Sequence, residues 1–338
     1  DGPYPTVYAD LLGTIDGLKA FHARRVGLRL VPDWPLSDRP EVLAACPDAP
    51  EVAQVDGFRF DQRSLLACAW GKPSEAFGPM YAGFDGPRRV ARLPGPPYHF
   101  MSRVRRVEGN MGEPKAGAAI EAEYDVPASA WYFDENGHPV MPFCVLLEAA
   151  LQPCGWLASY VGSALGTDED LAFRNLDGTS KVLGELRPGS GPLRTISTLK
   201  SISRSGGMIL ESFQVRCLQG DRPILQMDTG FGFFPPATFA NQAGLPTTPE
   251  ESAALEASSD FLVDLRRRPA RYCAGSLRLP GPMLLMLDRV TAYDARGGRA
   301  GLGTLRAEKD VDPSEWFFKA HFFQDPVQPG SLGLEAML

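Results

Sequence analysis

The sequence predicts an α+β fold in which an antiparallel sheet wraps a central helix, with the whole arrangement present twice in tandem. Residues 143–165 are nearly all apolar, and Glu148 is their one charged residue, which is typical of a buried helix. Candidate strands separated by Gly and Pro turns follow this segment. A motif from the region of this helix then recurs near the end of the chain, which indicates a duplication.

The remaining elements follow from local patterns. Short helices are expected at residues 8–25 and 61–70. Ser205-Gly-Gly and the segment 219–223 have the spacing of hairpin turns, so the strands that flank them are expected to pair antiparallel. Alternating or apolar segments predict strands at residues 103–107, 119–124, 181–186, 193–203, 208–218 and 224–234.

One long helix followed by a run of antiparallel strands is the order of a hot-dog fold, in which a curved sheet wraps the helix. The helix that begins at Gly330 is still short when Leu338 is reached, so the second hot dog is expected to be truncated. The expected divisions are an N-terminal linker or helical region at 1–88, a first hot dog at 89–240, a linker at 241–259 and the start of a second hot dog at 260–338.

The duplication is read from two matching segments, 131–148 and 316–335. Both contain Trp-aromatic-Phe, then Pro-Val-x-Pro, then Leu-Glu, and the first is two residues shorter between its Trp and its Pro-Val. The upstream sequence Arg-Leu-Pro-Gly-Pro also occurs twice, at 92–96 and at 278–282. The two copies are therefore expected to adopt the same fold.

His321 stands five residues before the Pro of the second segment, and counting back five from Pro139 in the first segment reaches Asp134. The first copy is therefore expected to lack a base at this place. His138, one residue before Pro139, is the other candidate for a second site, although a loop or helix-cap role is the simpler interpretation of it.

The motif carries the groups that are needed to remove water from a 3-hydroxyacyl thioester. An imidazole such as His321 can take the weakly acidic α proton. A glutamic acid on an apolar helix, such as Glu148 or Glu335, can be held protonated by burial and can donate to the departing hydroxyl. The backbone N–H groups of Gly330 and Ser331, at a helix N-terminus, can polarise the thioester carbonyl.

Residues 321–335 resemble the motif of FabA-type 3-hydroxyacyl carrier-protein dehydratases, which is a His, then Asp-Pro-Val-x-Pro-Gly, then Leu-Gly-Leu and an acid. Residues 77–94, 138–148 and 316–330 further resemble the dehydratase region of polyunsaturated fatty acid synthases, which are polyketide-synthase-like megasynthases. In that region a pseudo-dehydratase hot dog precedes the active one. The resemblance therefore implies that the first copy is the pseudo-dehydratase.

The resemblance also implies the layout of the site, because such sites form between two hot dogs. His321 is expected to face Glu148 of the first copy, whereas Glu335 would meet Asp134 or His138 in an inert second site. The implied reaction is dehydration to a trans-2-enoyl thioester, with no bound cofactor or metal and with the substrate on the phosphopantetheine of an acyl carrier protein. The implied partners are that carrier, other domains of the same megasynthase and a second copy of the chain in a homodimer.

Composition limits the alternatives. The 338 residues carry a net charge of −7, which argues against nucleic-acid binding, and the six cysteines contain no Cys-x-x-Cys pair that would suggest a zinc site. Glu148, Gln152 and Pro153 interrupt the most apolar stretch, so we expect no membrane span. The charge balance suits a cytoplasmic enzyme. Two rival functions remain open, a hot-dog thioesterase and a non-catalytic carrier-protein docking or scaffold module.

Overall fold

The computed structural model describes residues 6–29, 34–48, 51–240 and 244–338. The chain divides into two compact units, Asp1–Ala45 and Cys46–Leu338. The region expected at 1–88 as one N-terminal segment therefore contributes to both units. Within the described ranges, no helix is both long enough and apolar enough to cross a membrane.

The first unit contains a hairpin where a helix was expected at residues 8–25. Strands β1 (Thr6–Ile15) and β2 (Leu18–Arg29) pair antiparallel, with Ile15 opposite Leu18. The two residues between them, Asp16 and Gly17, have φ values of 51° and 78°, as a type I′ turn requires. The Asp-Gly pair therefore overrides the helical interpretation. The short helices η1 (Pro35–Asp38) and α1 (Pro40–Ala44) complete this unit.

The second unit begins with a small helical layer that packs against the first hot dog. Asp61 caps helix α2 by accepting hydrogen bonds from two backbone N–H groups, which confirms the helix expected at residues 61–70. The Tyr81 hydroxyl donates to the carbonyl of Ser159 at 2.6 Å, so this layer is fixed to the central helix. The layer consists of β3 (Gln54–Val55), β4 (Phe58–Arg59), α2 (Gln62–Trp70), α3 (Pro73–Phe77) and η2 (Pro79–Phe84).

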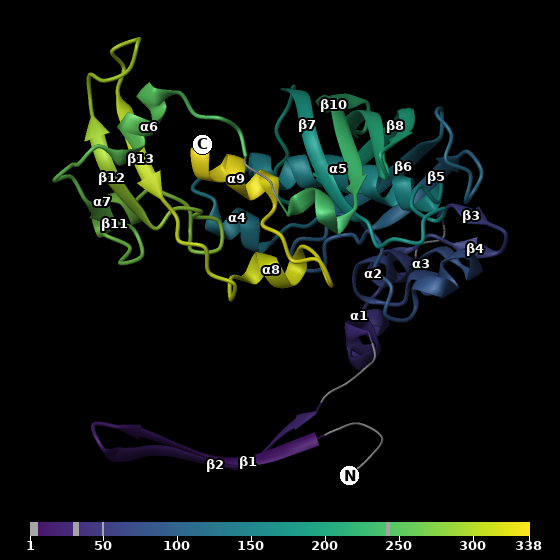
Figure 1. Cartoon of the computed structure of the whole chain (residues 1–338), viewed down its shortest axis with the longest axis horizontal. Coiled ribbons are helices and arrows are strands. Elements are labelled where there is room, and N and C mark those ends of the chain that lie inside the picture. Colours follow the sequence, from purple (N-terminus) through teal and green to yellow (C-terminus); the bar gives the residue numbers. More distant parts are fainter. Residues whose placement is uncertain (1–5, 30–33, 49–50, 241–243) are drawn as a thin grey trace. The chain divides into compact units, whose positions relative to one another are not determined.

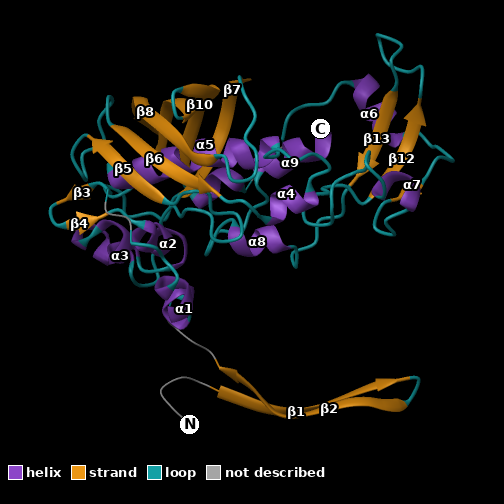
Figure 2. Cartoon of the chain, turned by 180° about the vertical axis from the view of Figure 1, so that it is seen from behind, coloured by secondary structure: helices purple, strands orange, loops and turns teal. Residues whose placement is uncertain are grey.

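The central sheet is antiparallel and has six strands. It curves around helix α5 (Phe143–Tyr160), as Figures 1 and 2 show. The strand order is β5-β6-β8-β9-β10-β7. The first strand after the helix begins at Ala172 and not at Lys181, and the helix ends at Tyr160 and not at Leu165. The strands are β5 (Arg103–Glu108), β6 (Ala119–Val126), β7 (Ala172–Val182), β8 (Gly191–Ser205), β9 (Met208–Gln219) and β10 (Arg222–Phe234).

Helix α5 is apolar on nearly every side because the sheet surrounds it, and Trp156 and Leu157 are fully buried. Pro153 lies inside the helix and has no N–H to donate to the carbonyl of Ala149. The Thr195 hydroxyl on β8 donates to that carbonyl instead, at 3.3 Å. A side chain of the sheet thus supplies the hydrogen bond that the Ala149 carbonyl cannot receive from within the helix.

The second copy repeats the early part of this hot dog. Its strands form a three-stranded antiparallel sheet, and α9 packs against α5 (Figure 1). The described elements after β10 are η3 (Pro236–Phe239), α6 (Pro249–Glu256), β11 (Val263–Asp264), α7 (Ala270–Cys273), β12 (Arg289–Asp294), β13 (Thr304–Glu308), α8 (Trp316–Ala320) and α9 (Gly330–Met337). Helix α4 (Trp131–Glu135) of the first copy corresponds to α8.

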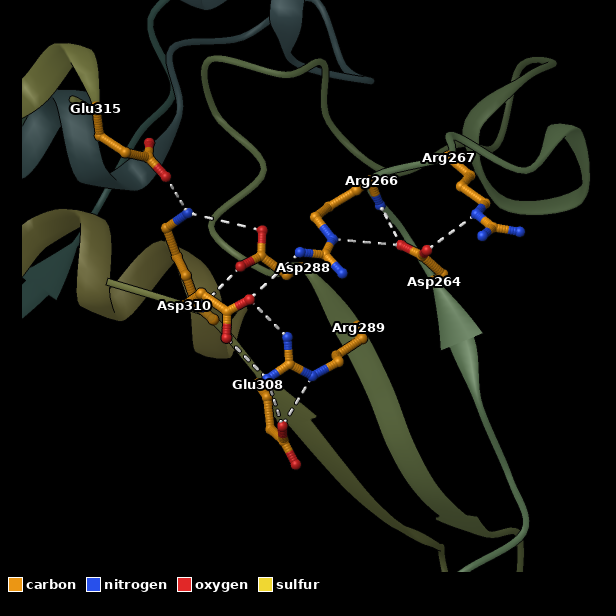
Figure 3. A network of polar contacts seen from close by, with 9 residues as sticks. Asp264, Arg266, Arg267, Asp288, Arg289, Glu308, Asp310 and Glu315 are labelled. Carbon is orange, nitrogen blue, oxygen red and sulfur yellow. Dashed lines mark hydrogen bonds and ion pairs between the residues drawn. The ribbon is translucent and has the colours of Figure 1, made fainter. Parts of the chain in front are cut away.

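An ion-pair pattern appears in both sheets and supports the duplication. Arg289 on β12 binds Glu308 and Asp310, each at 2.8 Å, within the network of Figure 3. Arg103 on β5 binds a Glu and an Asp in the same way. The neighbouring Arg266 also pairs with Asp310. Arg103, Arg266 and Arg289 are therefore all paired with carboxylates.

Shortening Leu157 to Ala should lower the free energy of unfolding by about 2–5 kcal/mol, because a fully buried side chain between helix and sheet would leave a cavity. Leu210→Ala is the control, since Leu210 is 37% exposed on β9 and should cost no more than about 1 kcal/mol. Urea unfolding followed by circular dichroism measures both. Equal losses would contradict the placement of Leu157 in the core.

Candidate active site

A cavity of about 410 Å³ lies where the first copy meets the second. Glu148 and Gln152 reach it from helix α5 of the first copy, and His321 reaches it from the loop after α8 of the second. Gly330 and Ser331 line it from the start of α9, and the polar side chains Arg92, Arg174, Asn175 and Gln328 line it as well. Residues that are far apart in sequence are thus brought to one site by the packing of α9 on α5.

Glu148 is a buried carboxylic acid, only 5% exposed. The Ser331 hydroxyl donates to one of its oxygens at 2.6 Å, and the Gln152 amide N–H approaches the other at 3.4 Å. Burial raises the pKa of Glu148 to about 6, and these two hydrogen bonds oppose that rise. The acid therefore keeps its proton to higher pH than an exposed glutamate does.

The groups around Glu148 are themselves held in place. The backbone N–H of Phe100 donates to the side-chain oxygen of Gln152 at 2.8 Å, and the Gln152 amide donates to the carbonyl of Tyr98 at 2.9 Å. These two bonds fix which end of the amide faces Glu148. The Tyr98 hydroxyl lies 2.9 Å from Ser331 Oγ and must donate to it, because the Ser331 proton is used on Glu148.

His321 ends helix α8 and is held by the loop that it begins. Its Nδ1 lies 2.9 Å from the carbonyl of Val327, and a carbonyl can only accept, so Nδ1 carries the hydrogen. The lone pair is therefore on Nε2. Burial lowers the pKa of His321 to about 4, which leaves the imidazole neutral and able to accept a proton at ordinary pH.

The start of helix α9 supplies two backbone donors to the same cavity. The N–H groups of Gly330 and Ser331 lie in the first helical turn, where no intrahelical acceptor is available. A Cβ atom built on Gly330 would have no neighbouring atom within 4 Å, so the space beside this residue is open. Free N–H groups at a helix N-terminus can bind a carbonyl or oxyanion.

Glu335 lies elsewhere, in an arrangement that mirrors the one around Glu148. It is half-buried on α9 and interacts with the Cys144 thiol of α5, whereas Glu148 of α5 accepts a hydrogen bond from Ser331 of α9. Burial raises the pKa of Glu335, and Cys144 opposes that rise. Glu335 is absent from the described lining of the cavity that holds His321.

The residue that corresponds to His321 in the first copy is Asn136, and not Asp134 as counting back from Pro139 suggests. Asn136 ends α4 as His321 ends α8, and its side-chain N–H donates to the carbonyl of Val140 at 3.0 Å, as His321 does to Val327. The two missing residues lie after this position, so the count was displaced by two. Asp134 and His138 are both exposed.

Reciprocal contacts join the two copies. The backbone N–H of Gly95 donates to the carbonyl of Ala320 at 2.8 Å, and the equivalent Gly281 donates to Glu135 at 2.7 Å. The rings of Trp131 and Trp316 meet with centroids 5.2 Å apart. Each copy thus contacts the loop of the other through equivalent groups.

An ion pair adds to this junction. Arg174 on β7 of the first copy binds both carboxylate oxygens of Asp325, at 2.6 and 2.9 Å, and so fixes the loop that follows His321. Arg174, Tyr98 and Gln152 were not predicted from the sequence as parts of the site. Gln152 had a detectable signal, because it is a polar residue one helical turn after Glu148 in an apolar segment.

Comparison with known proteins agrees with this architecture. The model of the family described as FabA-like domain matches residues 93–228 and 279–338, which together are more than half of the chain. A polyunsaturated fatty acid synthase polypeptide from a Thraustochytrium species is 30% identical over 295 residues. That alignment covers 79% of this chain and 19% of the relative, so the chain spans less than a fifth of that protein.

Similar solved structures include a conserved protein from Pseudomonas aeruginosa, which is 15% identical, with 34% of this chain and 81% of that chain covered and a TM-score of 0.28. A hypothetical thioesterase with coenzyme A from Streptococcus pneumoniae is 13% identical, with 38% and 85% covered and a TM-score of 0.29. Scores this low carry no weight for the assignment, which rests on the family match. From that match, supported by the sheet wrapped around α5 and the paired copies, the chain belongs to the FabA-like domain family.

Proposed function

We propose that this chain dehydrates 3-hydroxyacyl carrier-protein thioesters to trans-2-enoyl thioesters in the synthesis of polyunsaturated fatty acids or related polyketides, and is a lyase. The observation that carries the proposal is the pairing of a neutral imidazole, His321, with a buried acid of raised pKa, Glu148, on one cavity. Such a pair can remove a proton from one carbon and protonate the group that leaves the next.

In the proposed reaction, the thioester carbonyl accepts hydrogen bonds from the N–H groups of Gly330 and Ser331, which stabilise the enolate as it forms. Nε2 of His321 takes the α proton. Glu148 gives its proton to the 3-hydroxyl group, the C–O bond breaks and water leaves as the double bond forms. His321 is then protonated and Glu148 ionised, so the transfer of one proton from imidazolium to carboxylate through solvent restores the site.

We propose that residues 89–240 form the pseudo-dehydratase hot dog and that residues 260–338 begin the active one, with 241–259 as the linker. Asn136 stands where the second copy has His321, and an amide cannot take a proton as an imidazole does. This supports a first copy that has no catalytic base of its own. The acid of that copy still serves the active site. The similarity to a polyunsaturated fatty acid synthase supports an acyl carrier protein and other domains of a megasynthase as partners.

Replacing His321 with Ala should lower kcat by about 10²–10⁴-fold, since a general base commonly contributes that much. The assay offers a 3-hydroxyacyl pantetheine thioester to the full-length protein and follows the absorbance of the enoyl thioester. His138→Ala is the control and should retain activity, because His138 is exposed and outside the cavity lining that is described. Undiminished dehydration by His321→Ala would refute the assignment, and release of free acid would assign a thioesterase.

Substitutions of Glu148 and Glu335 should have different effects on turnover, although the two residues occupy matching positions in the repeated motif. Glu148→Gln should lower kcat by about 10²–10⁴-fold through loss of the proton donor, whereas Glu335→Gln should leave kcat within about threefold. Both variants keep the shape of the side chain, so each is the control for the other. Loss of turnover in Glu335→Gln with normal turnover in Glu148→Gln would show that the first copy is only a structural partner.

The pH dependence follows from the two shifted groups. Glu148 must be protonated, so kcat/KM should fall as the pH rises through its pKa of about 6. His321 must be neutral, so kcat/KM should also fall as the pH drops towards about 4. Steady-state rates measured between about pH 3.5 and about pH 8.5 should give a bell-shaped profile of kcat/KM. Its two apparent pKa values should lie within about one pH unit of 4 and 6. A profile that keeps rising above about pH 7 would exclude Glu148 as the acid.

A further inference from the structure

Arg92 is a buried cation between the helical layer and the active-site loop, and only 6% of it is exposed. Its Nη1 donates to the carbonyl of Gly71 at 2.7 Å and approaches those of Ala67 and Cys68 at 3.4 Å. These carbonyls close the C-terminal end of helix α2, where the helix dipole is negative. One edge of the guanidinium is therefore held by helix α2, which lies outside the two hot dogs.

The other side of Arg92 faces the loop that follows His321. Nη2 lies 3.4 Å from the side-chain oxygen of Gln324, and the guanidinium carbon lies 5.8 Å from the centre of the Phe323 ring. Gln324 has a φ of 69°, which non-glycine residues seldom adopt, and it lies in a turn that two backbone hydrogen bonds between Phe322 and Asp325 close. Arg92 also lines the cavity that contains His321 and Glu148.

The duplicated arginine performs the corresponding task at the other loop. Arg278 donates to the carbonyls of Asp134 and Asn136, at 3.1 and 3.3 Å, in the loop of the first copy where the base is missing. Each copy thus sends an arginine from its Arg-Leu-Pro-Gly-Pro segment to the loop of the other copy. Arg92 reaches the loop with a histidine, and Arg278 reaches the loop with Asn136.

We propose that Arg92 is a positioning residue for His321. It anchors the loop that carries this base to the C-terminal end of helix α2. This inference rests on the proposed function. Arginine suits the task because its planar fork can bind carbonyls on one edge and Gln324 on the other, whereas the point charge of lysine cannot span both. The helical layer at residues 62–71 is then a support of the active site rather than a linker.

The test compares Arg92→Lys with Arg278→Lys in the full-length protein. Arg92→Lys should lower kcat by about 10–100-fold with KM within about twofold, because a displaced base slows the chemical step more than substrate binding. Arg278→Lys is the matched control and should leave kcat within about twofold, because its loop carries no base. Gln324→Met, which removes the acceptor but leaves Arg92 in place, should lower kcat in the same direction by about 3–10-fold.

A second readout does not depend on turnover. The chain has four histidines, so the imidazole of His321 can be followed by NMR titration, with His321→Ala to assign its signal. A loosened loop admits water, so Arg92→Lys should raise the pKa of His321 from about 4 towards ~6.5, the value of an exposed histidine. The acid limb of kcat/KM should move upward with it, and Arg278→Lys should change neither.

The outcomes separate the two proposals. A pKa of His321 that responds to Arg92→Lys in a protein without dehydratase activity would refute the proposed function and retain the positioning role. Dehydration with unchanged kcat and unchanged pKa in Arg92→Lys would refute the positioning role alone. Equal losses of kcat in Arg92→Lys and Arg278→Lys would also refute the positioning role, because both arginines would then act only by stabilising the fold. If Arg92→Lys does not fold, the response of Gln324→Met decides in the same way.

Discussion

The hydrogen bond from Ser331 to Glu148 is the contact on which the rest of the site depends, because it joins the central helices of the two copies at the reacting groups. It is buried, so its loss would leave a polar group without a partner in a region of low dielectric. The same serine also carries one of the two free backbone N–H donors at the start of α9. A single contact therefore sets the distance between the acid and the donors for the substrate carbonyl.

The sequence predicted the architecture well where patterns were local and repeated. The apolar helix, the strands before residue 130 and after residue 190, and the motif around His321 were all evident from periodicity and spacing. The sequence predicts too late a start for β7 because residues 172–180 are mostly exposed and lack apolar alternation. The N-terminal hairpin differs from the helix predicted at residues 8–25 because Asp16 and Gly17 form a turn with positive φ, which a helix cannot contain.

The site was predictable only for residues within the motif. Counting from a proline cannot reveal whether the two missing residues lie before or after the base position, so the count predicts Asp134 where the backbone places Asn136. Tyr98, Arg92 and Arg174 act through contacts between segments far apart in the chain, and no local spacing records such contacts. These long-range contacts decide the orientation of the groups, whereas the motif decides only their identity.

The pairing of the two copies within one polypeptide has a genetic consequence. In an assembly of two identical chains, any change in the gene appears on both sides of the axis, so replacing the histidine would remove both bases together. Here the two halves are encoded separately, and asparagine at 136 leaves histidine at 321 untouched. Likewise, cysteine occupies position 144 while serine occupies the matching position 331. Each half can accumulate its own mutations, provided that the surface it offers to the other is preserved.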